Sequence, residues 1–144
     1  MKKQTRLENY KKIASGEAPD IPYAQLLDTR LTKIGDGKAT VQMEAKSPAH
    51  SNPIGKLHGG ALTSLADYAM GMAYISVLPD DEVFGTVELK VNFLRPIENA
   101  TLIAEAEVVK NGKTIGLVEC TVRTSEGALV SRAYSTCMRM KAET

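Results

Sequence analysis

The sequence predicts an α+β fold in which one long apolar helix packs against an antiparallel sheet of about six strands. Apolar and small residues fill the stretch from Gly59 to Leu78, and strand-like alternation occurs both before and after it. An apolar sheet face needs a cover, and this stretch is the large apolar cover that the chain offers. At 144 residues, the chain has the usual size of one domain.

A short peripheral helix is expected at the N-terminus. Apolar residues recur there at intervals of three, at Leu7, Tyr10 and Ile13, which is typical of an amphipathic helix. The uninterrupted apolar core of a secretion signal is missing from this segment. We therefore expect residues 1–20 to form the peripheral helix and residues 21–144 to form a single domain, in a cytoplasmic protein.

Strands are predicted on both sides of the apolar stretch. Before it, the runs TRLTKI and KATVQMEA, between Thr29 and Ala45, are separated by GDG, which predicts a hairpin. After it, the NG pair at residues 111–112 is a strong signal for a second hairpin. Alternation and turn residues predict strands over residues 87–93, 102–108, 113–124 and 128–140.

The predicted helix is apolar on almost all sides. Leu62, Leu65 and Ala69 form one face, and Met70 and Tyr74 extend the apolar surface around the others. A flat sheet covers one side of a helix, so complete burial requires that the sheet curls around it or that a second subunit covers the rest. We therefore expect a homo-oligomer.

The composition argues against several other classes of protein. The 18 basic and 17 acidic residues are balanced, so the basic excess of a nucleic-acid-binding protein is missing. Cys120 and Cys137 lack a CxxC spacing and are expected to be small buried residues in a reduced protein. The two histidines have no spacing that suits a metal site. Asp67 and several glycines argue against a membrane span over residues 59–78.

One ionisable carboxylate, Asp67, stands in the stretch between Lys56 and Asp80. Burial of an unpaired carboxylate is costly, because burial raises its pKa or demands a partner. A structural role stays open, in which Asp67 accepts a hydrogen bond from a loop amide or reaches a surface groove. The loop that precedes the helix favours a catalytic role.

This loop, SPAHSNPIGK, leads into HGG at residues 58–60, where the helix is expected to begin. Glycines let a ligand approach the backbone closely, and free amides at a helix start suit an oxyanion. Asn52 and His58 stand just ahead of these glycines, although each is also typical of an ordinary turn or structural residue. Together these groups suit attack of water on an activated carbonyl.

The spacing of the two strongest candidates imposes a condition on the site. Gly59 and Asp67 lie about 12 Å apart along one helix, so they cannot contact the same carbonyl group. If both are catalytic, Gly59 of one subunit and Asp67 of another share a site across a two-fold axis. Burial of the helix and chemistry of the site therefore both predict a dimer.

The combined motif N-x-x-G-x-x-H-G-G-x-x-x-x-L-x-D, with the order strand, strand, helix, four strands, resembles the hotdog-fold acyl-CoA thioesterases of the PaaI-like, phenylacetate-degradation type. The resemblance covers about residues 20–140. It implies a curled antiparallel sheet wrapped around one central helix. It also implies homodimers whose sheets join edge to edge and a homotetramer built as a dimer of dimers.

The resemblance implies a role for each motif residue. Asp67 would act as general base or as nucleophile, and the Gly59 amide of the other subunit would hold the thioester oxygen. Asn52 would orient water or the leaving group, and His58 would support the loop. Thr86 matches a hydroxyl residue that assists the carboxylate, although strict alternation along its strand places it on the outward, polar face.

The expected substrate is an acyl-CoA, without a metal and without a cofactor other than the CoA of the substrate itself. Scattered Lys and Arg residues are available for the CoA phosphates, and no motif singles one out. Two alternatives share the same fold. One is an enoyl-thioester hydratase or dehydratase, which usually pairs a histidine with the acid in a different motif. The other is a non-catalytic acyl-CoA binding protein.

Overall fold

The computed structural model describes residues 5–46 and 48–143. Its helices are α1 (Arg6–Ser15), α2 (Pro22–Leu26) and α3 (Gly59–Ile75). Its strands are β1 (Thr29–Gly35), β2 (Lys38–Ala45), β3 (Glu82–Phe93), β4 (Ala100–Asn111), β5 (Ile115–Thr124) and β6 (Leu129–Lys141). The predicted order of two strands, one long helix and four strands is confirmed, and α2 is an additional element.

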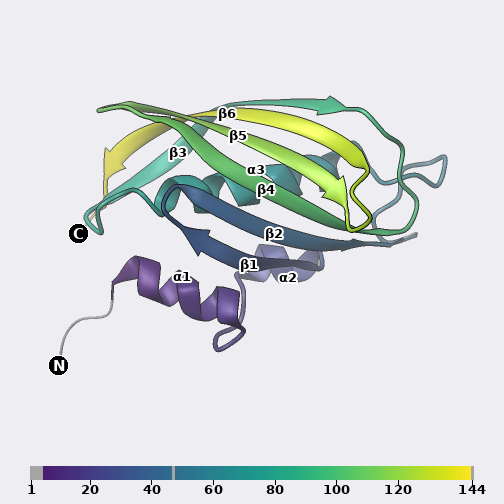
Figure 1. The fold of residues 1–144 in the computed structure, drawn as a ribbon, viewed down its shortest axis with the longest axis horizontal. Coiled ribbons are helices and arrows are strands. Elements are labelled where there is room, and N and C mark those ends of the chain that lie inside the picture. The colour runs from purple at the N-terminus through teal and green to yellow at the C-terminus, as the bar shows by residue number, and fades with distance from the viewer. Residues whose placement is uncertain (1–4, 47, 144) are drawn as a thin grey trace.

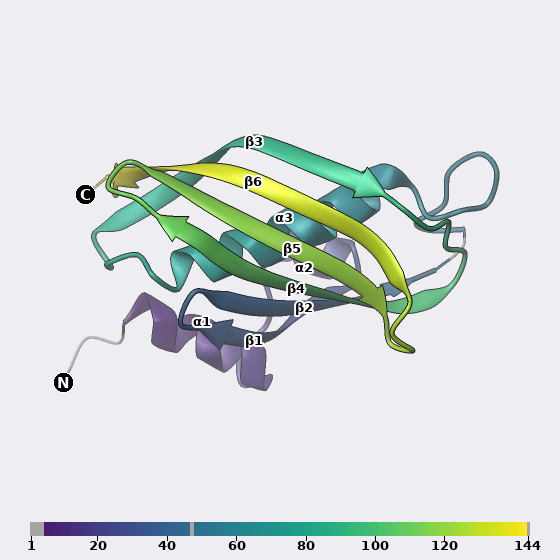
Figure 2. The ribbon, with the colours of Figure 1, turned by 45° about the horizontal axis from the view of Figure 1, so that its top comes forward.

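The strands form one antiparallel sheet in the order β1-β2-β4-β5-β6-β3, so β1 and β3 are its edges. Figure 1 shows α3 lying along one face of this sheet, with α1 and α2 beside the β1 edge. In Figure 2 the strands arch over α3. The α+β class and the hotdog arrangement of a curled sheet around a central helix are therefore confirmed.

The core lies between α3 and the concave face of the sheet. Leu65, Met70 and Tyr74 of α3 are completely buried, as are Met43 of β2 and Val122 of β5. Burial of this apolar area is the main favourable contribution to folding. The curl of the sheet supplies most of the cover that the apolar helix was predicted to need.

The helix nevertheless keeps one partly exposed side, which the sequence pattern did not predict. The half-buried residues there are Ala61, Thr63, Ser64, Asp67 and Tyr68. This side lies toward α2 and the edge strand β3, because Ser64, Asp67 and Tyr68 line a cavity with residues of α2 and Asp67 accepts a hydrogen bond from β3. The carboxylate thus lies on the side of α3 that the sheet does not cover.

Both predicted hairpin turns are present. In the β1–β2 turn, Asp36 and Gly37 have φ angles of 52° and 76°, the left-handed conformation that this type of turn requires. In the β4–β5 turn the Gly112 amide donates to the Ile115 carbonyl. A Cβ atom on Gly112 would lie 2.4 Å from that carbonyl oxygen, so the turn needs glycine.

The central helix ends at Ile75, before the predicted end at Leu78. The amides of Val77 and Leu78 donate to carbonyls three residues back rather than four, which tightens the chain before Pro79. The Ser76 hydroxyl donates to the Ala73 carbonyl and accepts from the Gly37 amide. These bonds tie the end of α3 to the β1–β2 turn.

The N-terminal helix is peripheral, as predicted. Thr5 and Glu8 form a capping box at its start, and Gly16, in the left-handed conformation, ends it. Tyr10 and Ile13 pack against the edge of the core, and no residue of α1 is fully buried. The helix is therefore an addition on the β1 side of the fold.

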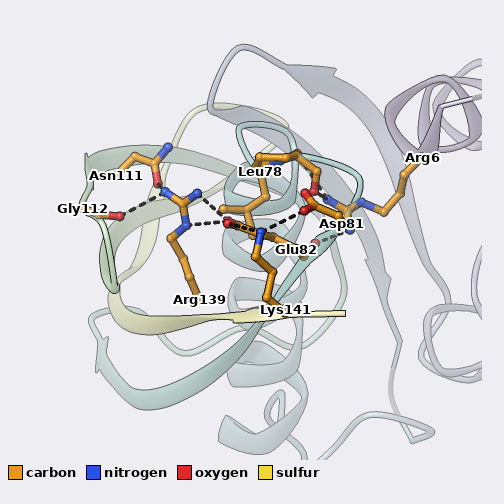
Figure 3. Close-up of polar contacts among 9 residues, drawn as sticks. Arg6, Leu78, Asp81, Glu82, Asn111, Gly112, Arg139 and Lys141 are labelled. Atoms are coloured by element: carbon orange, nitrogen blue, oxygen red, sulfur yellow. Dashed lines mark hydrogen bonds and ion pairs between the residues drawn. The ribbon is translucent and has the colours of Figure 1, made fainter. Parts of the chain in front are cut away.

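A cluster of polar contacts attaches this helix to the segment between α3 and β3 (Figure 3). The Arg6 guanidinium donates to the carbonyls of Leu78 and Glu82, and also to that of Pro79. Beside it, Arg139 of β6 pairs with the Glu82 carboxylate. The cluster therefore joins α1, the start of β3 and the end of β6.

Candidate active site

Asp67 lies on the partly open side of α3, where its carboxylate meets the edge strand β3. Its Oδ1 atom accepts a hydrogen bond from the Thr86 hydroxyl across 3.3 Å. Burial raises the pKa of Asp67 above its usual range, and the Thr86 hydrogen bond opposes part of this rise. A carboxylate with a raised pKa is a stronger base than an ordinary exposed one.

Thr86 points toward the helix, so the outward placement that strict alternation predicted is wrong. The pairing of β3 with β6 shifts by one residue between Thr86 and Glu88, where Val87 is left without a partner. This β-bulge reverses the alternation, so Thr86 faces α3 while Glu88 faces outward. Because β3 is a sheet edge, Thr86 stays exposed as well.

Behind Thr86, the neighbouring strand supplies a buried thiol. Thr86 pairs directly with Cys137 of β6, and the Cys137 sulfur lies 3.6 Å from the Ser135 hydroxyl. Burial raises the pKa of Cys137, and it raises that of Cys120 to about 12. Both cysteines are free and buried, which confirms their predicted character as small core residues.

His58 is the N-cap of α3. Its Nδ1 atom accepts a hydrogen bond of 2.8 Å from the Gly60 amide, which satisfies one of the free amides at the helix start. The Nδ1 lone pair is therefore occupied by this hydrogen bond. In this position His58 stabilises the glycine turn, which agrees with the loop-supporting role that the resemblance implies.

The adjacent Gly59 amide donates no hydrogen bond to any of the residues that the structure describes. A Cβ atom at this position would lie 3.2 Å from the Phe93 ring, so the glycine leaves narrow space between the helix start and β3. The free amide also stands at the positive end of the helix dipole. It is therefore suited to bind an oxyanion.

Asn52 organises the loop before α3. Its Oδ1 atom accepts hydrogen bonds from the amides of Ile54 and Lys56, at 3.1 and 3.0 Å. The side-chain oxygen is thus occupied, and the side-chain NH2 group remains to contact a ligand. Asn52 and Gly59 line the same cavity, of about 430 Å³, against Phe93 of β3.

A single chain therefore holds two separate groups of candidate residues. Asn52 and Gly59 meet at the start of α3, and Asp67 meets Thr86 about two turns further along the helix. The rise of about 12 Å between Gly59 and Asp67 keeps them apart within one subunit. Each chain thus presents a free amide at the start of α3 and a carboxylate about two turns further along it.

Most of these candidate residues, with the exception of Asn52, lie in the part of the chain that a known family shares. A family model described as the thioesterase superfamily matches residues 54–131, more than half of the chain. The chain belongs to the thioesterase superfamily. Hydrolysis of a thioester is the reaction of this family, and the site residues from Gly59 to Thr86 all fall inside the matched segment.

Individual relatives of this thioesterase agree with the family assignment. It is 32% identical over 99 residues to a 1,4-dihydroxy-2-naphthoyl-CoA hydrolase of Listeria monocytogenes, covering 68% of this chain and 79% of the relative. Its structure is similar to that of a thioesterase family protein from Silicibacter pomeroyi. That match has a TM-score of 0.81 and 27% identity, and it covers 92% of this chain and 99% of the other.

The phenylacetic acid degradation protein PaaI of Thermus thermophilus, solved as a point mutant, is also similar. The two structures match with a TM-score of 0.76 and 25% identity, covering 83% of the thioesterase chain and all of PaaI. The thioesterase is thus of the PaaI-like hotdog type that its motif predicted.

Sequence reasoning missed α2 and the cavity beside it. Asp67 also lines a cavity of about 270 Å³ whose other wall is α2, with Tyr23 and Leu27. The one signal in the sequence was Pro22, which stands in the first turn of this five-residue helix. Five residues are too few to show a helical period, so the pattern alone does not reveal the element.

The described residues were compared with the requirements of a metal site and of a membrane-spanning helix. Its His, Cys, Asp and Glu side chains form no cluster of three or more that suits a metal ion, within the described residues. In the same two ranges, 5–46 and 48–143, none of the helices combines the length and hydropathy needed to cross a bilayer.

Proposed function

We propose that this thioesterase hydrolyses acyl-CoA to a free acid and CoA, with Asp67 as the base that activates water. The observation that carries the proposal is the half-buried Asp67 carboxylate, whose pKa burial raises and which lines a cavity. The Listeria relative that acts on a CoA thioester, by its name, supports CoA as the carrier.

In the proposed reaction, Asp67 takes a proton from water as the water oxygen bonds to the thioester carbon. The carbonyl oxygen becomes an oxyanion, and the Gly59 amide of the partner subunit stabilises it. The C–S bond then breaks, and the proton held by Asp67 passes to the departing CoA sulfur. The products are a carboxylic acid and a free thiol. Thr86 holds the carboxylate in place throughout.

A homodimer is part of the proposal, because one chain does not bring Asp67 and Gly59 together. The edge strand β3 supports this assembly. Exposed apolar side chains lie along this strand and just after it, at Val87, Phe93 and Leu94, each more than half accessible in the single chain. Pairing of two β3 edges would cover them and would place two α3 helices side by side.

The cavity at the start of α3 suits the anionic CoA part of the substrate. Lys56 and Arg95 both line it, beside the NH2 group of Asn52 and the free amide of Gly59. The Lys56 Nζ atom lies 3.4 Å from the Glu98 carboxylate at the surface. Such an exposed ion pair is weak, so a CoA phosphate can take the place of the Glu98 carboxylate beside Lys56. We expect the CoA phosphates to bind at Lys56 and Arg95, and the pantetheine arm to run from there to the thioester, which lies between Gly59 and Asp67 of the partner.

A thiol-release assay over short, medium, long and aryl acyl-CoAs tests the proposal. Asp67→Asn should lower kcat by roughly 10²- to 10⁴-fold, the range for a positioned base. Its thermal stability at neutral pH should equal or exceed that of the wild type, because a buried charge is removed. Asp36→Asn, the same change in the exposed β1–β2 turn, should leave kcat unchanged.

Three outcomes would contradict the proposal. A wild-type kcat in the Asp67→Asn variant would show that Asp67 is not the base of the reaction. Turnover of an enoyl-CoA without thiol release would instead indicate a hydratase, and tight acyl-CoA binding without any turnover would indicate a binding protein.

A further inference from the structure

The cavity between α2 and α3 has one open polar group on its wall. It has a volume of about 270 Å³ and is lined by residues of both helices, among them Tyr23, Leu27, Ser64, Asp67 and Tyr68. This volume lies just below the range of roughly 300–1,000 Å³ that is usual for pockets of drug-sized ligands. The cavity therefore fits a group smaller than a whole acyl-CoA.

The hydroxyl groups that line this cavity are all engaged with protein atoms. The Tyr68 hydroxyl donates to the Asp20 carboxylate, and the buried Thr29 hydroxyl donates to the Ala24 carbonyl at 3.0 Å. The hydroxyls of Tyr23 and Ser64 lie 3.0 Å apart and are bonded to each other. Asp67 is thus the polar group still able to act on a ligand, and the remaining surface suits an apolar one.

Another cavity, also of about 430 Å³ but separate from the one that Asn52 and Gly59 line, continues along α3 toward the helix start. It is lined by His50, His58 and Ala61, and it shares Tyr23, Leu27 and Ser64 with the first cavity. The two cavities are therefore two halves of one groove between α2 and α3. The hydrogen bond between Tyr23 and Ser64 crosses the groove at the point where the halves meet.

We propose that the cavity beside Asp67 holds the acyl group of the thioester, and that Tyr23, held by Ser64, sets the longest acyl chain that fits. This inference rests on the proposed function, and it adds the residue that determines substrate length. An acyl chain whose carbonyl lies at Asp67 extends along α3 and meets the Tyr23 side chain at the far end of the cavity.

Tyr23 is suited to this role because it is held by few contacts. It belongs to a five-residue helix, its side chain is 55% exposed, and its hydroxyl is bonded across the groove to Ser64. Removal of the ring joins the two halves of the groove. Each further methylene that the groove then buries should improve kcat/KM by about fourfold.

The experiment compares kcat/KM for straight-chain acyl-CoAs from acetyl to palmitoyl in the wild type, Tyr23→Ala and Tyr23→Phe. Leu26→Ala is the matched control, because Leu26 lies in the same helix, is 76% exposed and lines neither half of the groove. We expect Tyr23→Ala to move the preferred chain length upward and to raise the ratio of long-chain to short-chain kcat/KM at least tenfold. Tyr23→Phe should move it less, and Leu26→Ala should keep the wild-type profile.

Hydrolysis of acyl-CoA with the same length profile in all four proteins would overturn the role of Tyr23 and leave the proposed function intact. A complete lack of thiol release would overturn the proposed function instead. Dissociation constants of free fatty acids of increasing length, measured by calorimetry on the same proteins, then still test the groove. Equal length dependence for wild type and Tyr23→Ala in that measurement would also overturn the inference. Circular dichroism checks that each variant is folded.

Discussion

The Thr86 hydroxyl donates a hydrogen bond to Oδ1 of Asp67, from the edge strand β3 to the central helix α3. The β-bulge at Val87 makes this contact possible, because it turns Thr86 inward while the rest of the strand keeps its polar residues outside. The contact joins the carboxylate to the sheet edge at which we propose that the partner subunit binds. Thr86 therefore acts on the electrostatics of Asp67 and is placed by the sheet register.

Replacement of Thr86 should change the pH dependence of hydrolysis. The hydrogen bond from Thr86 lowers the pKa of Asp67 against the effect of burial, so Thr86→Val should raise that pKa further. Asp67 acts as a base when ionised, so the acidic limb of the kcat/KM profile should move to higher pH. Thr86→Ser keeps the hydroxyl and should keep the limb in place. Identical pH profiles for Thr86→Val and the wild type would contradict an effect of Thr86 on the pKa of Asp67.

Mixed dimers should show whether the site is shared between subunits. Gly59→Pro removes the amide donor, and proline suits the backbone there because Gly59 is the first residue of α3. Its Cβ atom would lie 3.2 Å from the Phe93 ring, so the end of that side chain must shift by a few tenths of an ångström. His58, with φ −64° and ψ 134°, already has the backbone conformation that precedes proline. Gly59→Pro and Asp67→Asn should each be nearly inactive alone.

When these two variants are unfolded, mixed in equal amounts and refolded, half of the dimers are mixed. Each mixed dimer has one site with both defects and one site with neither, so about a quarter of the wild-type activity should return. The double variant Gly59→Pro/Asp67→Asn, refolded with wild-type chain, supplies the matched reference. Absence of any recovery in the first mixture would place both residues in a site within one chain.

Gly116 in β5 should be essential for packing of the central helix. A Cβ atom there would lie 2.3 Å from Cζ of Tyr74, which is completely buried. Gly116→Ala should therefore lower the free energy of unfolding by about 1–3 kcal/mol, measured by urea denaturation. Gly85→Ala in β3 is the control, because its Cβ atom would lie 3.5 Å from Met140, an ordinary contact. Equal stability of the two variants would contradict the prediction.

Arg6 should fasten the N-terminal helix to the body of the protein. Its guanidinium donates to three carbonyls between Leu78 and Glu82 (Figure 3), and its loss removes these three hydrogen bonds. Arg6→Ala should lower the free energy of unfolding by about 1–3 kcal/mol. Arg30→Ala, at an exposed position of β1, should change it little. Limited proteolysis should also cleave α1 faster in Arg6→Ala, and equal cleavage in both variants would contradict this role.

Much of the fold could be predicted because its helix and turns are specified by patterns of residues that are close in the sequence. The apolar run from Gly59 predicts the central helix, and GDG and NG predict two hairpins, since a helix period or a turn depends on residues that are close in the chain. The same holds for the candidate site. A lone carboxylate in an apolar helix and glycines at its start are visible without the structure, and their spacing already implied two subunits.

The sequence by itself thus determined the order of the elements, singled out Asp67 and Gly59 as candidate site residues, and set the distance between them along the central helix. The tertiary structure decided the direction of Thr86, because a bulge depends on the register with β6 and a one-residue shift reverses every side chain after it. It also decided that Tyr23 and Ser64 close a cavity beside Asp67. That contact joins residues far apart in the chain, and long-range packing brings such residues together.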